Sequence, residues 1–483
     1  MNINDKEFVK EVTSQAVDFS QWYLDIVLKT EMMDYAPIKG CMAIRPYGYA
    51  IWENIQQLLD RRIKETGHKN AYFPLFIPES LLEKEAEHVE GFAPEVALVT
   101  RGGNEELAEK LVVRPTSEAI ICEMYARWIQ SWRDLPLLIN QWCNVVRWEK
   151  NTRPFLRTSE FLWQEGHTVH ATEEEAQEET LKLLGVYQDL LESELAIPVI
   201  PGQKTEKEKF AGALRTYTIE ALMADGKALQ AGTSHNLGQH FAKVFEIKFQ
   251  DKDDELKYAW TTSWGVSTRL IGALIMVHGD DRGLKLPPRV APIQVVIVPI
   301  IGKKSKDEVL RRANEVAAGL RSINIRVELD DREGYSPGWK FNQWEMKGVP
   351  LRLEIGPRDL ENKGVTAVRR DTGEKSFLLD QDLSAQLPLL LQNIQDSLFE
   401  HALKFREQKT YRPQDYGDFK EALDEKKGFM LAHWCGDARC EEEIKAGTKA
   451  TIRCIPFDSD PKDKGPCLFC QKEGRPVYFA RSY

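Results

Sequence analysis

A charged and aromatic hairpin at residues 146–167 constrains the fold of this chain more than any other feature. The text VRWEKNTRPFLRTSEFLWQEGH joins two strand-like segments through a basic turn at 150–154. Side chains alternate across a strand, so Arg147 and Glu149 share one face of the first segment. One face of the second segment carries Arg157, Phe161, Trp163, Glu165 and His167. A solvated hairpin would scatter charges in this way, whereas aromatics interleaved with charges favour a ligand with a planar part and an anionic part.

Length and composition narrow the class of protein. The 483 residues suffice for two to four domains, and an apolar content of 42% is typical of soluble globular proteins. The longest strongly apolar run, LIGALIMV at 270–277, is too short to cross a bilayer, and the N-terminal MNINDKEFVKEV lacks the apolar stretch of a signal peptide. We therefore expect a cytoplasmic protein with no membrane partner. A formal charge of −10 disfavours indiscriminate binding to polyanions but allows local basic surfaces.

Three blocks follow one another along the chain. Residues 1–290 alternate long amphipathic helices, at 48–67 and 171–195, with strands, and end in the Pro-rich bend KLPPRVAP. Residues 291–400 alternate strands with helices, which predicts a small, mostly parallel α/β domain. Residues 401–483 contain five of the eight cysteines. The fold class predicted from these patterns is α/β, with α+β character.

The cysteine block has the spacing of a metal site. Cys435 and Cys440 form a C-x4-C pair, and Cys467 and Cys470 form a C-x2-C pair. Two short pairs suit tetrahedral thiolate coordination, and in a cytoplasmic chain zinc is favoured over a disulfide. Four sulfur ligands leave no open position, so we expect a structural Zn2+. Cys454 is expected to be a buried apolar residue, and His433 is a weaker alternative ligand.

Other clusters point to a ligand that carries phosphate. RPTSEAIICEMYARW begins a helix near Ser117, with Thr116 and Glu118 at its start, although a first-turn glutamate is also stabilising without a ligand. In TTSWGVSTRLIGALIMVHGDDRG a Gly-bearing loop leads into a helix with Arg269 in its first turn. The helix dipole disfavours a cation there, so Arg269 is expected to help the helix N-terminus to hold a phosphate. The small-residue segment LQAGTSHNLGQ adds Gln230, Thr233 and His235.

Together these segments resemble, in order, the active-site segments of the prolyl-tRNA synthetases, class II enzymes, in their archaeal/eukaryotic-like form. The matching segments are RPTSE, RWE…PFLRTSEFLWQEGH, QAGTSHNLGQ and WGVSTRLIG…VHGDDRGLKLPPRVAP. The helix from Tyr47 together with Pro74 resembles motif 1, the hairpin motif 2, and the Arg269 segment motif 3. The resemblance extends over nearly the whole chain, including the cysteine module and the terminal YFARSY.

The resemblance implies an antiparallel-sheet catalytic domain at 1–290, an α/β anticodon-binding domain at 291–400, and a small zinc-binding α+β domain at 401–483. It also implies a homodimer formed through motif 1, with L-proline, ATP accompanied by Mg2+, and tRNA(Pro) as ligands. The implied proline-binding residues are Thr116, Glu118, Arg147, Trp163, Glu165, His167 and His235. The implied ATP-binding residues are Arg147, Glu149, Arg157, Gln230, Thr233, Ser267 and Arg269, of which Arg147 and Arg269 would be catalytic.

Such an enzyme joins proline to ATP, releases pyrophosphate, and passes proline to the 3' end of tRNA. Only about one hundred residues separate the hairpin from the Arg269 segment, so we expect none of the editing insertion of bacterial-type relatives. Two alternatives stay open: a class II ligase of the same subgroup for threonine or glycine, and a tRNA-binding paralogue without catalysis. Trp163, His167 and His235 could also be structural, as we expect His170 and His278 to be.

Overall fold

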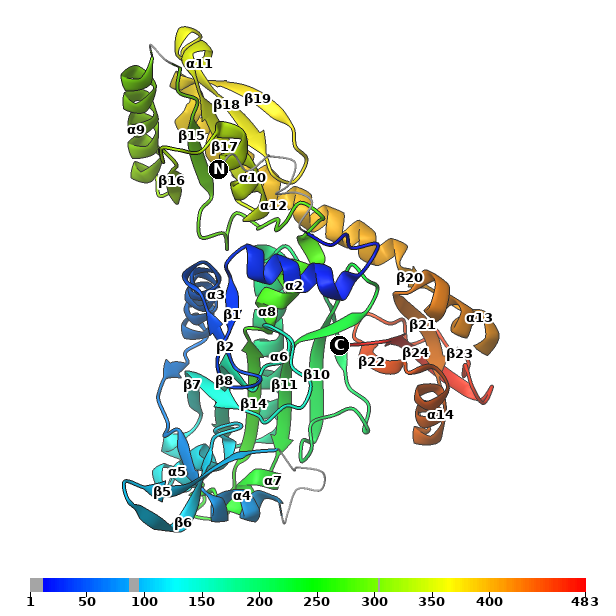
Figure 1. Cartoon of the computed structure of the whole chain (residues 1–483). Helices are drawn as coiled ribbons and strands as arrows, with labels where there is room; N and C mark the ends of the chain where they lie inside the picture. The colour runs from blue at the N-terminus through cyan, green and yellow to red at the C-terminus, as the bar shows by residue number, and fades with distance from the viewer. Residues whose placement is uncertain (1–11, 87–94, 303–304) are drawn as a thin grey trace.

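The computed structural model describes residues 12–86, 95–302 and 305–483 of the chain. Figure 1 shows a central body, a separate α/β domain at one end, and a C-terminal module at the side. The long helix α12 (Leu383–Gln408) runs from the α/β domain to the C-terminal module. None of the helices within the described residues combines the length and apolar character that a membrane crossing requires.

An antiparallel sheet forms the centre of the body and confirms the expected catalytic architecture. Its middle strands pair in the order β9-β10-β11-β14-β8-β7, and each neighbouring pair is antiparallel. The strand bounds are β7 Leu137–Val146, β8 Glu160–His170, β9 Ile200–Gln203, β10 Arg215–Leu222, β11 Ala228–Gly238 and β14 Trp260–Ser267.

Helices α3 (Pro46–Glu65), α6 (Glu173–Asp189) and α8 (Arg269–His278) share one apolar core with the sheet. Helix α3 confirms the predicted amphipathic pattern, because Ile51, Ile55 and Leu59 are fully buried. It begins with proline at its first turn and ends before Gly67, whose φ of +93° a residue with a side chain rarely adopts. Helix α6 continues as one π-helical turn, η2 (Leu190–Glu194), within the helix predicted at 171–195.

The hairpin exists, but its connection is longer than predicted. Strand β7 ends at Val146 and β8 begins at Glu160, so Arg147 and Glu149 follow the first strand instead of lying in it. The turn predicted at 150–154 is wrong, because the whole segment 147–159 forms the connection. Within this connection Arg153 and Arg157 bridge each other across a turn in which Phe155 adopts a left-handed φ of +58°.

Two segments rich in small residues are strands, and the second of them was predicted to be a loop. The segment with Gln230, Thr233 and His235 is β11, and the Gly-bearing segment before Arg269 is β14. Gly265 of β14 explains the difference, because a Cβ there would lie 3.0 Å from the Gln164 carbonyl oxygen of the neighbouring strand. Glycine here allows close strand approach and does not turn the chain.

The α/β domain contains a five-stranded sheet in the order β16-β15-β17-β18-β19. Strand β15 (Val295–Pro299) pairs in parallel with β16 (Val327–Leu329) and β17 (Leu351–Ile355). The prediction of a mostly parallel sheet is wrong, because β18 (Gly364–Arg369) and β19 (Lys375–Leu379) pair antiparallel. The links before β18 and β19 are shorter than the dozen or so residues that a parallel crossover requires. Helix α9 (Lys306–Ser322) and α10 (Pro337–Met346) pack against β15.

The C-terminal module extends the central sheet. Its strands β21 (Phe429–Trp434), β22 (Thr451–Pro456) and β24 (Glu473–Ala480) pair side by side, and β22 pairs with β9 of the body. The boundary predicted at residue 400 falls inside α12. Tyr483 contacts the body, since its hydroxyl donates to Asp225 at 2.6 Å and its backbone N–H donates to the Ala228 carbonyl at 3.3 Å.

Candidate active site

A cavity of about 300 Å³ lies over the central sheet and contains most of the predicted site residues. All seven residues predicted for proline line it, as do the ATP candidates Gln230, Thr233, Ser267 and Arg269. The predicted alternation along β8 is confirmed, because Phe161, Trp163, Glu165 and His167 all face this cavity. The sequence interpretation missed the lining residues Glu208, Lys209, Phe210, Thr216, Ala231, Gly232, Ser263, Trp264, Gly265 and Val266.

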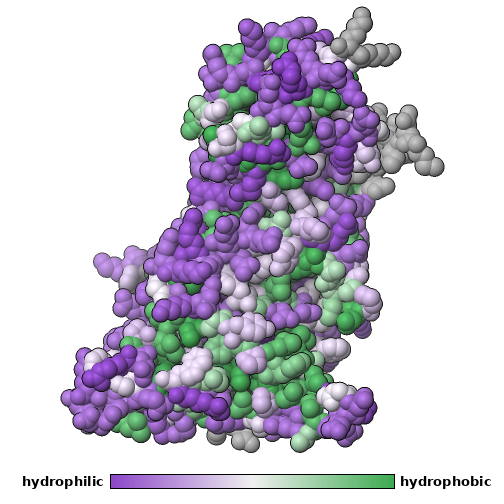
Figure 2. Space-filling view, turned by 90° about the vertical axis from the view of Figure 1, so that its left-hand side faces the viewer, coloured by the Kyte–Doolittle hydropathy of each residue, from purple (hydrophilic) through white to green (hydrophobic). Residues whose placement is uncertain are grey.

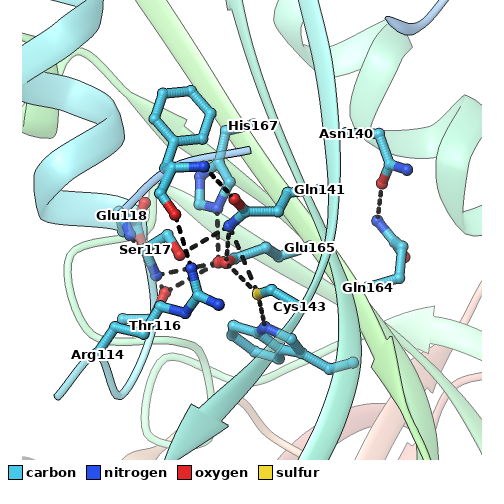
Figure 3. A network of polar contacts seen from close by, with 12 residues as sticks. Arg114, Thr116, Ser117, Glu118, Asn140, Gln141, Cys143, Gln164, Glu165 and His167 are labelled. Atoms are coloured by element: carbon cyan, nitrogen blue, oxygen red, sulfur yellow. Dashed lines mark hydrogen bonds and ion pairs between the residues drawn. The ribbon is translucent and has the colours of Figure 1, made fainter. Parts of the chain in front are cut away.

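Glu165 is the centre of a buried hydrogen-bond network, shown in Figure 3. Its Oε1 accepts from Gln141 Nε2 at 2.9 Å, and its Oε2 accepts from the Ser117 backbone N–H at 3.1 Å. His167 Nε2 lies 3.1 Å from Oε2. Burial alone would raise the pKa of Glu165, but the His167 and Ser117 contacts outweigh it and lower the pKa to about 2. Glu165 is therefore a fixed anion at neutral pH.

Gln141 and Cys143 support this network and were not predicted. Gln141 is fully buried, and its Nε2 also donates to Ser117 Oγ at 2.9 Å. Cys143 Sγ accepts from Trp163 Nε1 at 3.2 Å. Both lie on β7 directly opposite their partners, since Gln141 pairs in register with Glu165 and Cys143 with Trp163. The hairpin register would have revealed them, but it depends on the length of the connection.

Helix α5 (Glu118–Trp128) presents its first turn to the same network. The prediction of a helix start near Ser117 is confirmed, and the Glu118 carboxylate is 98% buried at the cavity wall. Thr116 Oγ1 lies 3.4 Å from Glu165 Oε2 and accepts from the Glu118 backbone N–H at 3.3 Å. Two carboxylates thus face one small pocket, which suits a cationic ligand.

Arg147 lies beside the aromatic side chains of the pocket. Its Nε donates to the Pro115 carbonyl at 3.0 Å, which fixes the guanidinium. The guanidinium carbon lies 5.4 Å from the centre of the Trp163 ring and 5.6 Å from that of Phe161. Burial lowers the pKa of Arg147, and the charges of Glu165 and Glu149 oppose that effect. Arg147 stays charged and lies between the carboxylate pocket and the second arginine of the cavity, Arg269.

Arg269 is the first residue of α8. Its Nε donates to the Leu156 carbonyl at 3.3 Å. Burial, followed by the charges of Arg147 and Arg157, lowers the pKa of Arg269 to about 10. Arg269 therefore stays protonated at neutral pH although other arginines repel it. A group of like charges beside a helix N-terminus is stabilised by a bound anion, so this end of the cavity suits phosphate.

His235 faces the cavity from β11 next to the loop before β10. Its Nδ1 lies 3.0 Å from Thr216 Oγ1, and its ring centre lies 4.8 Å from that of Phe210. Burial, with a smaller contribution from His167, lowers the pKa of His235 to about 3. The imidazole is therefore neutral at pH 7 and acts as a wall and hydrogen-bonding group.

Glu149 and Arg157 do not line the cavity, although both were predicted to bind ATP. They lie in the hairpin connection, where Arg157 Nε is 3.6 Å from Glu149 Oε2. Of their two charges, Arg157 lowers the pKa of Arg269 and Glu149 raises it. Of the two histidines expected to be structural, His278 donates from Nε2 to the Leu195 carbonyl at 2.9 Å, and His170 bonds to Thr168 Oγ1 at 2.7 Å.

The four predicted cysteines form a second site in the C-terminal module. Their Sγ atoms all lie within 4.8 Å of one another, and Cys435 is 3.7 Å from Cys440 and 3.6 Å from Cys470. A tetrahedron with Zn–S bonds of about 2.3 Å has edges of about 3.8 Å, so the four sulfurs fit one zinc ion. Cys454 and His433 are not members of this group of four. Cys454 is fully buried in β22, and His433 bonds to Asp463 at 2.9 Å.

Comparison with known proteins identifies the family. Family models match at residues 99–278 (tRNA synthetase class II core domain, G, H, P, S and T), 294–387 (anticodon binding domain) and 416–483 (prolyl-tRNA synthetase, C-terminal). The proline–tRNA ligase of Natranaerobius thermophilus is 62% identical, with all of both chains covered. The chain belongs to the prolyl-tRNA synthetase family. The class II sequence resemblance is thereby confirmed.

Further relatives agree with this family assignment. The proline–tRNA ligase of Alkaliphilus oremlandii is 61% identical over the full length of both chains. A crystal structure of prolyl-tRNA synthetase from Cryptosporidium parvum, complexed with halofuginone and AMPPNP, superimposes with a TM-score of 0.94 at 45% identity, covering 98% of this chain and 99% of that one. A second one, complexed with L-proline and AMP, gives a TM-score of 0.92 at 42% identity, covering 100% and 99%.

Proposed function

We propose that the protein is a proline–tRNA ligase that activates L-proline with ATP and transfers it to tRNA(Pro). The observation that carries the proposal is the shape of one cavity, which joins a pocket of carboxylates and aromatic rings to a cluster of arginines. Proline combines a cationic secondary ammonium with a compact apolar ring, and ATP brings a polyanion. The two ends of the cavity match these two substrates in charge, and the Cryptosporidium parvum relatives bind L-proline, AMP and AMPPNP.

The carboxylate end would hold proline. Glu118 pairs with the secondary ammonium, while Trp163 and His167 pack around the pyrrolidine ring. Glu165 does not need to touch the substrate to matter, because it holds Ser117, at the start of α5, and His167 in place. Thr116 and His235 complete the wall of this pocket.

The arginine end would hold the triphosphate. The proline carboxylate attacks the α-phosphorus, the bond to the β-phosphate oxygen breaks, and pyrophosphate leaves. The attacking carboxylate is already ionised, so no general base is required. Catalysis then comes from alignment of the two substrates and from Arg147 and Arg269, which stabilise the charge that develops on the phosphate oxygens. Gln230, Thr233 and Ser267 hold the nucleotide in the cavity. Glu149 and Arg157 lie outside the cavity, so they would contact only a part of ATP that extends beyond it toward the hairpin connection.

Mg2+ would arrive with ATP and supply further neutralisation of the phosphates when bound. Among the described residues, the cysteine cluster is the one group of three or more His, Cys, Asp or Glu side chains arranged to hold a metal ion. The cysteine cluster would hold Zn2+ in a structural role, because four thiolates leave no position open for substrate.

The tRNA would contact the α/β domain at a second cavity, of about 170 Å³. Its lining includes the cations Arg282, Arg352, Arg369, Arg370 and Lys375. Glu345 is the one acidic residue of that lining, and it pairs with Arg282 at 2.7 Å. The other four cations are also paired, with Asp280, Asp371 and Glu354, so the tRNA backbone would have to compete with these carboxylates for them. Such binding would weaken steeply as the salt concentration rises.

A homodimer would form on the side of the body that carries α3. Figure 2 shows that side, where apolar side chains gather on the lower half of the molecule. Elements on this side carry several large apolar side chains that are exposed: Tyr35, Tyr49, Tyr72, Phe76 and Trp128. Large exposed apolar side chains gathered on one side of a protein mark an interaction surface. Sedimentation of the purified protein as a dimer is expected, and a monomer at micromolar concentration would contradict it.

Proline-dependent exchange of pyrophosphate into ATP, tested with all twenty amino acids and without tRNA, examines the proposed function. Strong exchange with proline and weak exchange with alanine is the expected result. Exchange with threonine or glycine alone would keep the fold and contradict the specificity. No exchange from a folded, zinc-containing sample would favour a tRNA-binding paralogue, although the arginines that catalysis requires are all present in the chain.

A further inference from the structure

Glu220, Lys204 and Arg453 form a buried group of three charges between the body and the C-terminal module. Lys204 Nζ lies 2.8 Å from Glu220 Oε1, and Arg453 Nη2 lies 2.9 Å from Glu220 Oε2. Arg453 Nε donates to the same Oε2 at 3.0 Å, and Lys204 Nζ also donates to the Arg453 carbonyl at 2.7 Å. At most 6% of each residue is exposed. Burial of three charges is costly unless they are paired as here.

The C-terminal module supplies one of the three charges. Arg453 lies on β22, which continues the central sheet by pairing with β9, where Ile455 is opposite Gln203. Lys204 follows β9, and Glu220 lies on β10, the next strand of the sheet. The module therefore inserts a guanidinium into the body at the edge of the strands that carry the candidate site.

Glu220 is close to the proposed ATP end of the cavity. It pairs in register with Gln230 across β10 and β11, and Thr218, two residues before it, pairs with Thr233. Opposite residues of an antiparallel pair point to the same face with Cβ atoms about 5 Å apart. Burial lowers the pKa of Arg269, and the Glu220 carboxylate is among the charges that oppose this lowering. Glu220 therefore lies on the strand next to Gln230, which lines the cavity together with Arg269.

A carboxylate at this position would weaken ATP binding unless cations neutralise its charge. An uncompensated anion beside the triphosphate would repel the phosphates and attract Arg269 away from them. Lys204 and Arg453 together compensate Glu220, and Thr218 Oγ1 donates to its Oε1 at 2.9 Å. Because Arg453 occupies Oε2 with two nitrogens, its removal would leave that oxygen without its cation.

We propose that Arg453 is a positioning residue for ATP, through which the C-terminal module neutralises Glu220 and keeps Arg269 and Gln230 oriented toward the nucleotide. The inference rests on the proposed function, since it requires that ATP binds at the arginine end of the cavity. Arg453 touches neither substrate. Through Arg453 the C-terminal module would take part in amino-acid activation, whereas its four clustered cysteines serve only the fold of the module.

The test compares KM for ATP with KM for proline in pyrophosphate exchange by the full-length, zinc-containing protein. Arg453→Met removes one positive charge near the phosphates and leaves Lys204 paired with Glu220, so it is expected to raise KM for ATP on the order of tenfold and to leave KM for proline within about twofold. Adding Glu220→Gln to Arg453→Met leaves Lys204 as the one charge of the three positions, which returns the group to its original net charge and should restore KM for ATP. Glu442→Gln, which breaks the exposed Lys207–Glu442 ion pair between the same two parts of the chain, is the matched control and should change neither constant.

Each outcome decides the proposal. An unchanged KM for ATP in Arg453→Met, or an equal rise in both KM values, would overturn it and leave the three charges a purely structural device. Zinc content and thermal unfolding show whether Arg453→Met folds. If it does not, KM for ATP is measured for the double variant with Glu220→Gln and Arg453→Met. A raised KM for ATP in the folded double variant overturns the proposal. Absence of proline-dependent exchange in the unsubstituted protein would instead refute the proposed function.

Discussion

Replacing Glu165 by glutamine should weaken both the fold and the proline pocket. The carboxylate accepts hydrogen bonds at both oxygens, from Gln141 at Oε1 and from Ser117 and His167 at Oε2. A glutamine side chain would present an NH2 group to one of these donors. Gln141 cannot compensate by turning its amide, because its own oxygen accepts from the Phe73 backbone N–H. At least one buried donor therefore loses its acceptor, whichever way the new amide is turned.

Two lines of reasoning give the same magnitude for this change. The pKa of Glu165 falls from an ordinary 4.5 to about 2 on folding, which is worth about 3 kcal/mol of stability at neutral pH. Loss of one or two hydrogen bonds to a charged group costs about 1.5–3 kcal/mol each. Because the folded pKa is depressed, this stability is present above pH 4.5 and is lost as the pH falls toward 2. E165Q should lack this part of the pH dependence.

The assay is urea unfolding at pH 7 together with pyrophosphate exchange. E165Q should lose about 3 kcal/mol of unfolding free energy, and its KM for proline should rise on the order of tenfold or more, since His167 and the start of α5 are no longer fixed. The matched control is E160Q on the same strand, where an exposed Glu160 accepts one bond from Asn144 at 2.9 Å. The reasoning is refuted if E165Q is as stable as E160Q and binds proline normally.

Four further predictions follow from other parts of the molecule. R269K should lower kcat/KM in exchange by about two orders of magnitude without altering thermal unfolding, because one amine cannot replace a guanidinium aimed at a developing charge; an unchanged rate would remove Arg269 from catalysis. Burial lowers the pKa of His170 and His278 to about 4, so unfolding free energy should fall by about 1.4 kcal/mol per pH unit for each as pH drops from 6.5 to 4, and H278Q should reduce that slope in a pH series of urea titrations. Alanine should support exchange about 10–200-fold less efficiently than proline, and the protein should not hydrolyse Ala-tRNA; measurable hydrolysis would contradict this. Metal analysis should find one zinc per chain and C467S should lose it, whereas C454S should keep it.

The sequence reveals local features of the site well, because they depend on short periodicities. Alternation along β8 identified the face with Trp163, Glu165 and His167, and the apolar spacing of α3 identified its buried side. The cysteine pairs likewise required no three-dimensional information, since short spacings already place sulfurs near one another. In each case the residues that cooperate are close in the sequence.

Features that depend on pairing between distant strands escaped prediction. Gln141 contributes through its register with Glu165, and Phe210 and Thr216 come from a segment that had no motif of its own. The same limit applies to Arg453, which reaches Glu220 from a position 233 residues away in the sequence. Small residues were also misleading, because Gly265 permits close strand packing where a loop was expected.

A crystal structure with a non-hydrolysable sulfamoyl analogue of prolyl-adenylate would test the central claim most directly. We expect the pyrrolidine ring among Trp163, Glu118 and His167, and the sulfamoyl group beside Arg147. The adenosine should lie along β11 toward Gln230 and Arg269. An analogue bound in the opposite direction, with its adenine in the carboxylate pocket, or bound outside this cavity, would contradict the assignment of the two ends.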